Sequence, residues 1–282
     1  MSIVDVKGIV EKKKQGLKRQ IMELRDKGIV PKLAVILAND DPASRIYVGR
    51  KRKLCVELGI DETEYLFDEK VTEQELLEVI DRLNKNDEIH GILIQLPLYK
   101  HIDEQKILDS VNPKKDVDSF SAINVGRLYQ GTGDIIPCTP KGILTILKEL
   151  EPNLAGKNVV VVGKSLIVGK PMAAILLNEG CTVTVCHSRT TNLVEHTKAA
   201  DILVVATGVP QLIKENMVKE NSIVIDVGLT KVKDKLVGDV DTDKVKDKVK
   251  YITPVPGGVG ITTVYSLMEN VVYLAKNTIK NK

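Results

Sequence analysis

Short apolar runs that are typical of buried strands alternate along the chain with longer segments of helical periodicity. In the N-terminal half, the strand-like runs cover 32–38, 63–67 and 90–98, and the helix-like segments cover 44–58 and 72–86. The second of these helices opens with a Thr-x-x-Glu capping pattern at Thr72. This alternation predicts a parallel sheet that helices cover on both faces.

The same alternation resumes after a polar stretch, with Gly and Pro residues, from Asn112 to Pro140. A helix-like segment at 141–151 comes first, then strand-like runs at 158–163, 181–186, 201–208 and 222–228, then a long helix at 257–279. We therefore expect an α/β protein of two α/β domains. Residues 1–140, joined by the final helix at 263–282, form the first, and residues 141–262 form a Rossmann-like dinucleotide-binding domain.

Composition narrows the class of protein. The chain has 282 residues, 43% of them hydrophobic and 28% charged, with a net charge of +3. So small a charge disfavours nucleic acid as a partner. No apolar run approaches the roughly 18 residues of a membrane span, and the first residues lack a signal-peptide core, so we expect a cytoplasmic protein.

The cysteines show no metal-binding or disulfide pattern. They are Cys55, Cys138, Cys181 and Cys186. None forms a CxxC pair, and no His stands at metal-ligand spacing, so we expect no metal site. Buried small apolar residues are the better interpretation.

A run of basic residues, Arg50 to Lys53, interrupts the helix-like segment at 44–58. At about 100° per residue, Lys51 falls at the centre of the apolar arc, one turn after Tyr47. Arg50 and Arg52 lie at its edges, and Lys53 points the opposite way. Lys51 is thus either a lysine whose stem covers apolar surface or a desolvated amine suited to acid–base chemistry. Because the four side chains diverge, a nucleic-acid patch fits poorly.

The segment "NVVVVGKSLIVGKPMAAILLNEG", residues 158–180, has the order strand, Gly-rich turn, helix. Gly163 ends the strand and Gly169 opens the helix, where backbone N–H groups would face a pyrophosphate. The spacing is Gly-x5-Gly, which differs from the common GxGxxG. An ordinary tight turn is the alternative.

The end of the following strand bears on cofactor choice. Sites that prefer NAD place an acid about 20 residues on, where it binds the ribose 2′-OH. Here Val185–Thr190 contains no acid, and Ser188 and Arg189 stand there instead, with Lys164 in the Gly-rich turn. A hydroxyl and two cations suit a 2′-phosphate, so we expect NADP.

Several stretches, taken in order, resemble one enzyme family. They are "PASRIYVGRKRKLCVELGI", "GILIQLPL", "KKDVDSFSAINVGRL", "PCTPKGI", "VVVVGKSLIVGKPMAAILL", "VTVCHSRT", "DILVVATG", "DVG" and "ITPVPGGVG". Together they resemble the bifunctional methylenetetrahydrofolate dehydrogenase/methenyltetrahydrofolate cyclohydrolase family over nearly the whole chain. The resemblance implies folate in a cleft between two domains, NADP along the second, a homodimer, and a supply of one-carbon units to purine biosynthesis.

The resemblance also implies roles for particular residues. Lys51 would transfer protons, Gln95 would hold its amine, Asp118 would bind the pterin, and Tyr47 would stack on the folate. The implied cofactor contacts are Gly163, Lys164, Ser165, Gly169, Ser188, Arg189, Thr207 and Gly208. Further substrate contacts are implied at Pro256, Gly257 and Gly258.

The chain departs from the family at several positions. Lys164 stands where Arg is usual, Ser119 where Gly is usual, and Ile261-Thr262 where Pro-Met is usual, in what we expect to be a folate-facing loop. A dehydrogenase without cyclohydrolase activity and a non-catalytic NADP-binding regulator are the alternatives. Retention of Lys51, Gln95 and Asp118 argues against the first.

Overall fold

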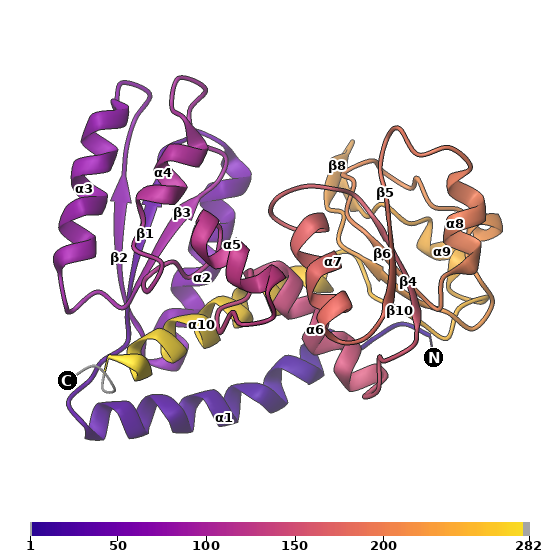
Figure 1. The fold of residues 1–282 in the computed structure, drawn as a ribbon, viewed down its shortest axis with the longest axis horizontal. Coiled ribbons are helices and arrows are strands. Elements are labelled where there is room, and N and C mark those ends of the chain that lie inside the picture. The colour runs from indigo at the N-terminus through magenta and orange to yellow at the C-terminus, as the bar shows by residue number, and fades with distance from the viewer. Residues whose placement is uncertain (1, 279–282) are drawn as a thin grey trace. The chain divides into compact units, whose positions relative to one another are not determined.

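A computed structural model of the chain describes residues 2–278, which divide into two compact units (Figure 1). The first unit comprises Lys12–Arg127, Gly133–Cys138 and the chain from Val264 on. The second unit comprises the chain up to Glu11, Leu128–Thr132 and Thr139–Thr263. The last residues of the expected final helix, 279–282, lie outside the described residues. The expected domain boundaries stay a prediction.

The first unit is built on a parallel sheet with the strand order β2-β1-β3. Its elements are β1 (Lys32–Leu37), α2 (Pro42–Leu58), β2 (Asp61–Leu66), α3 (Glu73–Lys85), β3 (Gly91–Gln95), α4 (Glu104–Ser110) and α5 (Ala122–Tyr129). The strands and helices predicted between residues 32 and 98 are therefore confirmed. The predicted capping box is also present, since Thr72 and Glu75 bond each other's backbone N–H groups.

Both faces of this sheet are buried. On one face, alternate strand residues such as Ala34 and Ile92 form a cluster with Leu76 and Ile80 of α3. On the other face Gly91 lies so close to Val117 that a Cβ atom would be 2.3 Å from it. Because both faces are covered, ligands of this unit have access chiefly to the strand ends.

The second unit contains a parallel sheet of order β10-β7-β6-β4-β5. Its strands are β4 (Asn158–Val162), β5 (Thr182–Cys186), β6 (Ile202–Val205), β7 (Ile223–Asp226) and β10 (Tyr251–Ile252), with a separate hairpin of β8 (Thr230–Val232) and β9 (Lys235–Val237). Its helices are α7 (Gly169–Asn178), α8 (Leu193–Ala199), the 3-10 turn η1 (Glu215–Met217) and α9 (Thr242–Val245). Strands β6 and β7 are buried throughout, as their continuous apolar runs predict.

The strand order of the second unit marks where a ligand binds. From β4 the chain moves first to β5 on one side and then to β6 on the other. In open α/β sheets ligands bind outside the carboxyl ends of the strands where the order reverses. That point lies at the turns after β4 and β6, and these turns contain Gly163 and Thr207.

Helices α1 (Val6–Asp26), α5, α6 (Cys138–Leu150) and α10 (Val259–Asn277) contain residues of both units. The predicted helices at 141–151 and 257–279 correspond to α6 and α10, so both are confirmed over the described residues. Before α1, Val4 and Ile252 are joined by a backbone hydrogen bond of 2.9 Å, which places the start of the chain beside β10.

Candidate functional site

Lys51 lies on the buried face of α2, as its position in the apolar arc predicts. The buried residues of this helix are Ser44, Val48, Lys51, Leu54, Cys55 and Leu58. Lys51 is only 8% exposed, whereas Arg50, Arg52 and Lys53 are all exposed. The basic run therefore consists of three surface side chains and one interior amine. Lys51 does not extend its amine into solvent.

Gln95 holds the amine of Lys51. The Lys51 Nζ atom donates to Gln95 Oε1 at 2.8 Å, which is the bond that the resemblance implies. The Gln95 amide nitrogen donates to the Leu96 carbonyl at 2.8 Å, so its oxygen is turned toward the amine. Since Gln95 ends β3, the fold brings a strand end and a buried helix face together at this point.

The two carboxylates of the Asp-Val-Asp stretch are used differently. Asp116 is buried and accepts from the Ser121 backbone at 2.9 Å and from the Asn124 amide at 3.1 Å. It therefore fixes the start of α5. Asp118 keeps part of its surface accessible. The second aspartate is thus the one available to a ligand, although its role at the pterin stays a prediction.

The amine and this carboxylate influence each other's protonation. Burial lowers the pKa of Lys51 below its ordinary value, and the negative charge of Asp118 acts in the opposite direction. Burial likewise raises the pKa of the Asp118 carboxyl, against the attraction of Lys51. A lowered amine pKa increases the neutral fraction near neutral pH, which is what proton transfer by lysine requires.

Tyr47 lies one turn before Lys51 and is half-buried. The Arg50 guanidinium carbon lies 5.7 Å from the centre of the Tyr47 ring, within the range of a cation–π contact. Arg50 thus helps to hold the ring in place. Stacking of Tyr47 on a substrate stays a prediction.

Ser119 occupies a backbone conformation that explains the family's preference for Gly. Its φ angle is 59°, in the left-handed region that glycine enters at least cost. The Ser119 hydroxyl is fully buried and donates to the Ile135 carbonyl at 3.0 Å. This hydrogen bond offsets part of the backbone strain directly after Asp118.

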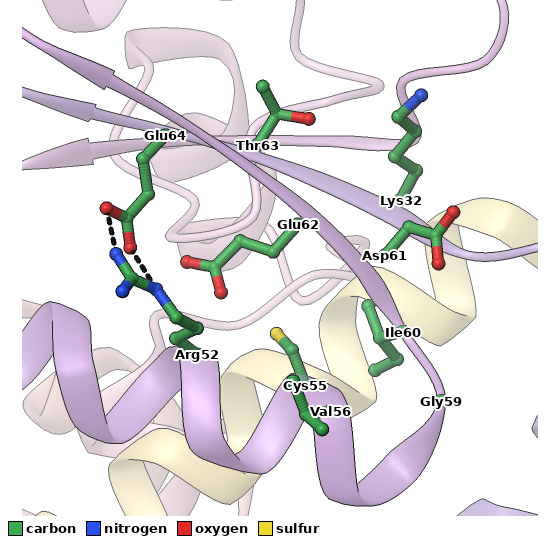
Figure 2. Close-up of a pocket in the computed structure, with 10 residues that line it drawn as sticks. All are labelled: Lys32, Arg52, Cys55, Val56, Gly59, Ile60, Asp61, Glu62, Thr63 and Glu64. Atoms are coloured by element: carbon green, nitrogen blue, oxygen red, sulfur yellow. Dashed lines mark hydrogen bonds and ion pairs between the residues drawn. The ribbon is translucent and has the colours of Figure 1, made fainter.

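A surface pocket of the first unit lies along α2 and β2, apart from these residues (Figure 2). Arg52 bonds the Glu64 carboxylate there, while Glu62 points toward the space between Arg52 and Cys55. Both carboxylate oxygens of Glu62 are buried without a hydrogen-bond partner among the described residues. Burial, with the nearby Glu64 charge, raises the pKa of Glu62 to about 7. The sequence analysis did not single out this residue.

In the second unit, the glycines of the turn after β4 are required by close approach. Gly163 has a φ of 129°, and a Cβ atom on it would lie 2.2 Å from the Ala206 carbonyl oxygen. A Cβ atom on Gly169 would lie 2.1 Å from the Gly163 carbonyl oxygen. The turns after β4 and β6 are therefore in contact, and the Gly-x5-Gly spacing serves this packing at the expected ligand-binding point.

The backbone N–H groups at the start of α7 bond within the turn. Val168 and Gly169 donate to the Ser165 hydroxyl at 3.2 and 3.4 Å, and Lys170 donates to the Ser165 carbonyl at 3.0 Å. These amides thus bond to Ser165 in the structure, and their contact with a pyrophosphate stays a prediction. Lys164, in contrast, is exposed.

The end of β5 carries the other residues expected at the 2′-phosphate. The Gly163 N–H donates to the Cys186 carbonyl at 2.8 Å, so the turns that contain Lys164 and Arg189 begin at neighbouring strand ends. The Arg189 backbone N–H donates to His187 Nδ1 at 3.1 Å, and both Ser188 and Arg189 are exposed. A hydroxyl and two cations thus follow adjacent strands at one edge of the sheet.

Thr207 and Gly208 follow β6, and a residue that the sequence analysis missed holds them. Asp239 is fully buried, and its Oδ2 atom accepts from both backbone N–H groups and from the Thr207 hydroxyl. Asp226, at the end of β7, accepts in turn from the Asp239 N–H at 2.9 Å. An acid at the end of an apolar strand and the pair Gly238-Asp239 were the only sequence signals for this arrangement.

Pro256, Gly257 and Gly258 directly precede α10 in the second unit. Pro256 follows a cis peptide bond, and Gly257 has a φ of 98°. Pro256 and Gly257 are exposed, while Gly258 is buried. Two of the three expected substrate contacts in this segment, Pro256 and Gly257, are thus accessible. The other expected site residues Lys51, Gln95 and Asp118 belong to the first unit.

The expectation that Ile261-Thr262 lies in a folate-facing loop is wrong. Both residues lie within α10, and Thr262 is fully buried. Its hydroxyl donates to the Val259 carbonyl at 2.9 Å, and its side chain lies against Gly142, where a Cβ atom would be 2.7 Å from Thr262 Oγ1. Thr262 is therefore a packing residue within the second unit.

Two other kinds of site, a membrane-spanning helix and a metal centre, concern residues 2–278. In this range no helix is both long and apolar enough to span a bilayer. No group of three or more His, Cys, Asp or Glu residues within it could hold a metal ion. All four cysteines are buried, as expected.

Comparison with known proteins matches both parts of the chain. Residues 4–118 match the catalytic domain, and residues 137–279 the NAD(P)-binding domain, of tetrahydrofolate dehydrogenase/cyclohydrolase. The chain is 52% identical to the bifunctional protein FolD of Nautilia profundicola over 99% of each chain. It is 51% identical to that of Bacillus licheniformis, again over 99% of each chain.

Solved structures agree with these matches. The crystal structure of the bifunctional enzyme FolD, methylenetetrahydrofolate dehydrogenase/cyclohydrolase, from Campylobacter jejuni is 48% identical, with a TM-score of 0.96 over 99% of each chain. The Trypanosoma brucei enzyme complexed with NADP cofactor and inhibitor is 36% identical, with a TM-score of 0.93 over 98% of each chain.

Proposed function

The chain belongs to the tetrahydrofolate dehydrogenase/cyclohydrolase family, and from this premise we propose that it catalyses both reactions in one-carbon metabolism. The first oxidises 5,10-methylenetetrahydrofolate to the methenyl cation with reduction of NADP. The second adds water to that cation and gives 10-formyltetrahydrofolate with release of a proton. Bifunctional relatives at about 50% identity over the whole chain favour this reading over a monofunctional dehydrogenase.

The observation that carries the proposal is the buried amine of Lys51 bonded to Gln95 at 2.8 Å. Hydrolysis of the cation requires that a proton leave the attacking water and that another reach the departing ring nitrogen. Lys51 is the group of the first unit suited to this transfer, because burial lowers its pKa. Gln95 fixes the position of the amine, and Asp118 binds the donor edge of the pterin.

NADP supplies the acceptor for the hydride when it is bound, so the chain's own task in oxidation is orientation. Gly163 and Gly169 allow the turn after β4 to lie against the turn after β6 at the switch point, where such a cofactor would bind. Lys164, Ser188 and Arg189 would bind the 2′-phosphate. Thr207 and Gly208 would contact the cofactor from the turn after β6.

Three further assignments rest on the family resemblance and on the sequence features given above. We propose that the chain forms a homodimer and acts in the cytoplasm. We also propose that its product serves purine biosynthesis. Sedimentation of the purified chain tests the first of these directly, since a monomer over the working concentration range would contradict it.

The experiment that tests the function follows both steps by ultraviolet absorbance. Purified protein is mixed with methylenetetrahydrofolate and NADP, and the formation of methenyltetrahydrofolate and NADPH is recorded. Methenyltetrahydrofolate alone is then supplied, and its loss is measured against the uncatalysed rate. Oxidation without accelerated hydrolysis would favour the monofunctional dehydrogenase. The absence of both reactions would refute the proposal.

A further inference from the structure

The buried carboxylate of Asp239 accepts hydrogen bonds from the turn after β6. Asp239 Oδ2 accepts from the Thr207 N–H at 2.6 Å, from the Thr207 hydroxyl at 2.9 Å and from the Gly208 N–H at 2.9 Å. Asp239 is fully buried. Hydrogen bonds to an ionised acceptor are about twice as strong as neutral ones, so three of them fix this turn firmly.

A second carboxylate fixes the first and the turn after β7. Asp226 accepts from the Gly228 N–H at 3.0 Å, from the Asp239 N–H at 2.9 Å and from the Val240 N–H at 3.0 Å. The chain around Asp239 is thereby tied to the end of β7. The turns after β6 and β7 therefore both depend on these two hydrogen-bonded carboxylates, which we call the Asp226–Asp239 pair.

The backbone leaves no space around this pair. A Cβ atom on Gly228 would lie 2.2 Å from Asp239 Oδ1, and one on Gly238 would lie 1.9 Å from Asp226 Oδ2. Each carboxylate thus occupies the space that a side chain on the neighbouring glycine would need. This close packing accompanies the hydrogen bonds that hold the turn after β6.

The opposite side of the same turn is open. Gly208 has a φ of 69°, and nothing lies within 4 Å of the position that its Cβ atom would take. Val209, the next residue, is exposed. The turn is therefore held by hydrogen bonds on one side and is accessible to a ligand on the other. It lies at the switch point of the sheet, where ligands bind in such folds.

We propose that Asp239 is a positioning residue for the nicotinamide cofactor, acting through the backbone of Thr207 and Gly208. The inference rests on the proposed function, because it takes NADP as the ligand of this turn. It also specifies which part of Thr207 would contact the cofactor. The Thr207 hydroxyl donates to Asp239 and accepts from the Val209 N–H at 3.1 Å, so the residue meets the cofactor through its backbone.

The test compares Asp239→Asn with the parent chain in three measurements. These are the dissociation constant for NADPH without folate, the KM and kcat for NADP in oxidation, and the rate of methenyltetrahydrofolate hydrolysis. Loss of the negative charge weakens all three hydrogen bonds. We expect the dissociation constant and KM to rise about 10-fold or more. The kcat should change less than about threefold, and hydrolysis, which uses no NADP, should keep its parental rate.

Asp241→Asn is the matched control, because Asp241 is a buried carboxylate two residues further along. Its Oδ2 atom pairs with the amines of Lys214 and Lys244 at 3.3 and 3.5 Å, and neither belongs to the turn after β6. NADPH binding should be unchanged. Thr207→Val removes one donor of the three and should raise the dissociation constant by about threefold, which keeps the inference testable if Asp239→Asn does not fold.

The outcomes separate the two proposals. If the parent binds NADPH while Asp239→Asn, or failing that Thr207→Val, binds it equally well, the inference is refuted and the function stands. Equal loss of oxidation and hydrolysis in Asp239→Asn would identify a general structural role and would also refute the inference. A parent chain that does not bind NADPH would refute the assigned cofactor together with the inference.

Discussion

Replacing Lys51 with methionine removes the buried amine while keeping the length of the side chain. The lost contact is the 2.8 Å bond to Gln95, on a residue that is 8% exposed. If Lys51 transfers the protons of hydrolysis, we expect the cyclohydrolase rate to fall about 100-fold or more, the usual contribution of a positioned acid–base group. That factor corresponds to about 2.7 kcal/mol of activation free energy.

The same substitution should leave stability nearly unchanged at neutral pH. The Gln95 hydrogen bond contributes about 1 kcal/mol, and removing a desolvated amine offsets part of that loss. The sign of the pH dependence follows from the lowered pKa of Lys51. Between that lowered pKa and the ordinary value, the unfolded chain binds more protons, so the parent gains stability as pH rises through this range. Lys51→Met should lack this gain.

The assay is the hydrolysis of methenyltetrahydrofolate followed by absorbance, with thermal unfolding recorded on the same samples. Lys53→Met is the matched control, since Lys53 is exposed on the opposite side of the same helix and should keep the parental rate. Oxidation by Lys51→Met should fall less than hydrolysis, because hydride transfer requires no acid or base. Hydrolysis by Lys51→Met at the parental rate, or an equal loss in Lys53→Met, would refute the assignment.

Three further predictions follow from the described residues. Asp118→Ala should weaken binding of a folate analogue by about 10-fold or more and leave NADPH binding intact; unchanged folate affinity in calorimetric titration would return Asp118 to a structural role. Lys164→Ala combined with Arg189→Ala should erase a parental preference for NADP over NAD of about 10- to 100-fold in kcat/KM; equal efficiency in the parent, or a preference that survives both changes, would contradict the phosphate contacts. The pKa of Glu62, raised to about 7, makes the parent lose stability as pH rises from about 4 to about 7. Glu62→Gln should therefore be more stable than the parent by about 1–2 kcal/mol at pH 8, after discounting for partial exposure, and as stable as the parent near pH 4. Denaturant unfolding of both proteins at pH 4 and pH 8 measures this difference; a variant that is less stable than the parent at pH 8 would show that the Glu62 carboxylate has a stabilising partner.

The buried position of Lys51 could be predicted because it depends only on the helical period of α2. Helix α1 shows the same kind of signal, since its buried residues Val10, Leu17, Ile21 and Leu24 recur at helical spacing, yet it was not among the predicted elements. The helical spacing of these apolar residues would therefore also have predicted α1.

Contacts between distant segments could not be predicted in this way. The Asp226–Asp239 pair depends on hydrogen bonds across 13 residues of sequence, between the end of a strand and the segment after a hairpin. Nothing in the spacing of the two acids distinguishes them from solvated residues. The misassigned Ile261-Thr262 segment has a related cause: the helix predicted at 257–279 already includes it, but the packing of Thr262 on Gly142 joins segments far apart in the sequence and could not be predicted.

The grouping of the chain into two units has a consequence for how the protein can be divided. The backbone passes from one unit to the other after Glu11, Arg127, Thr132, Cys138 and Thr263. A fragment cut at any one of these points keeps pieces that belong with the missing part; residues 2–4, for example, would lose their hydrogen bonds to Ile252. Neither unit can therefore be excised as one continuous segment of the chain.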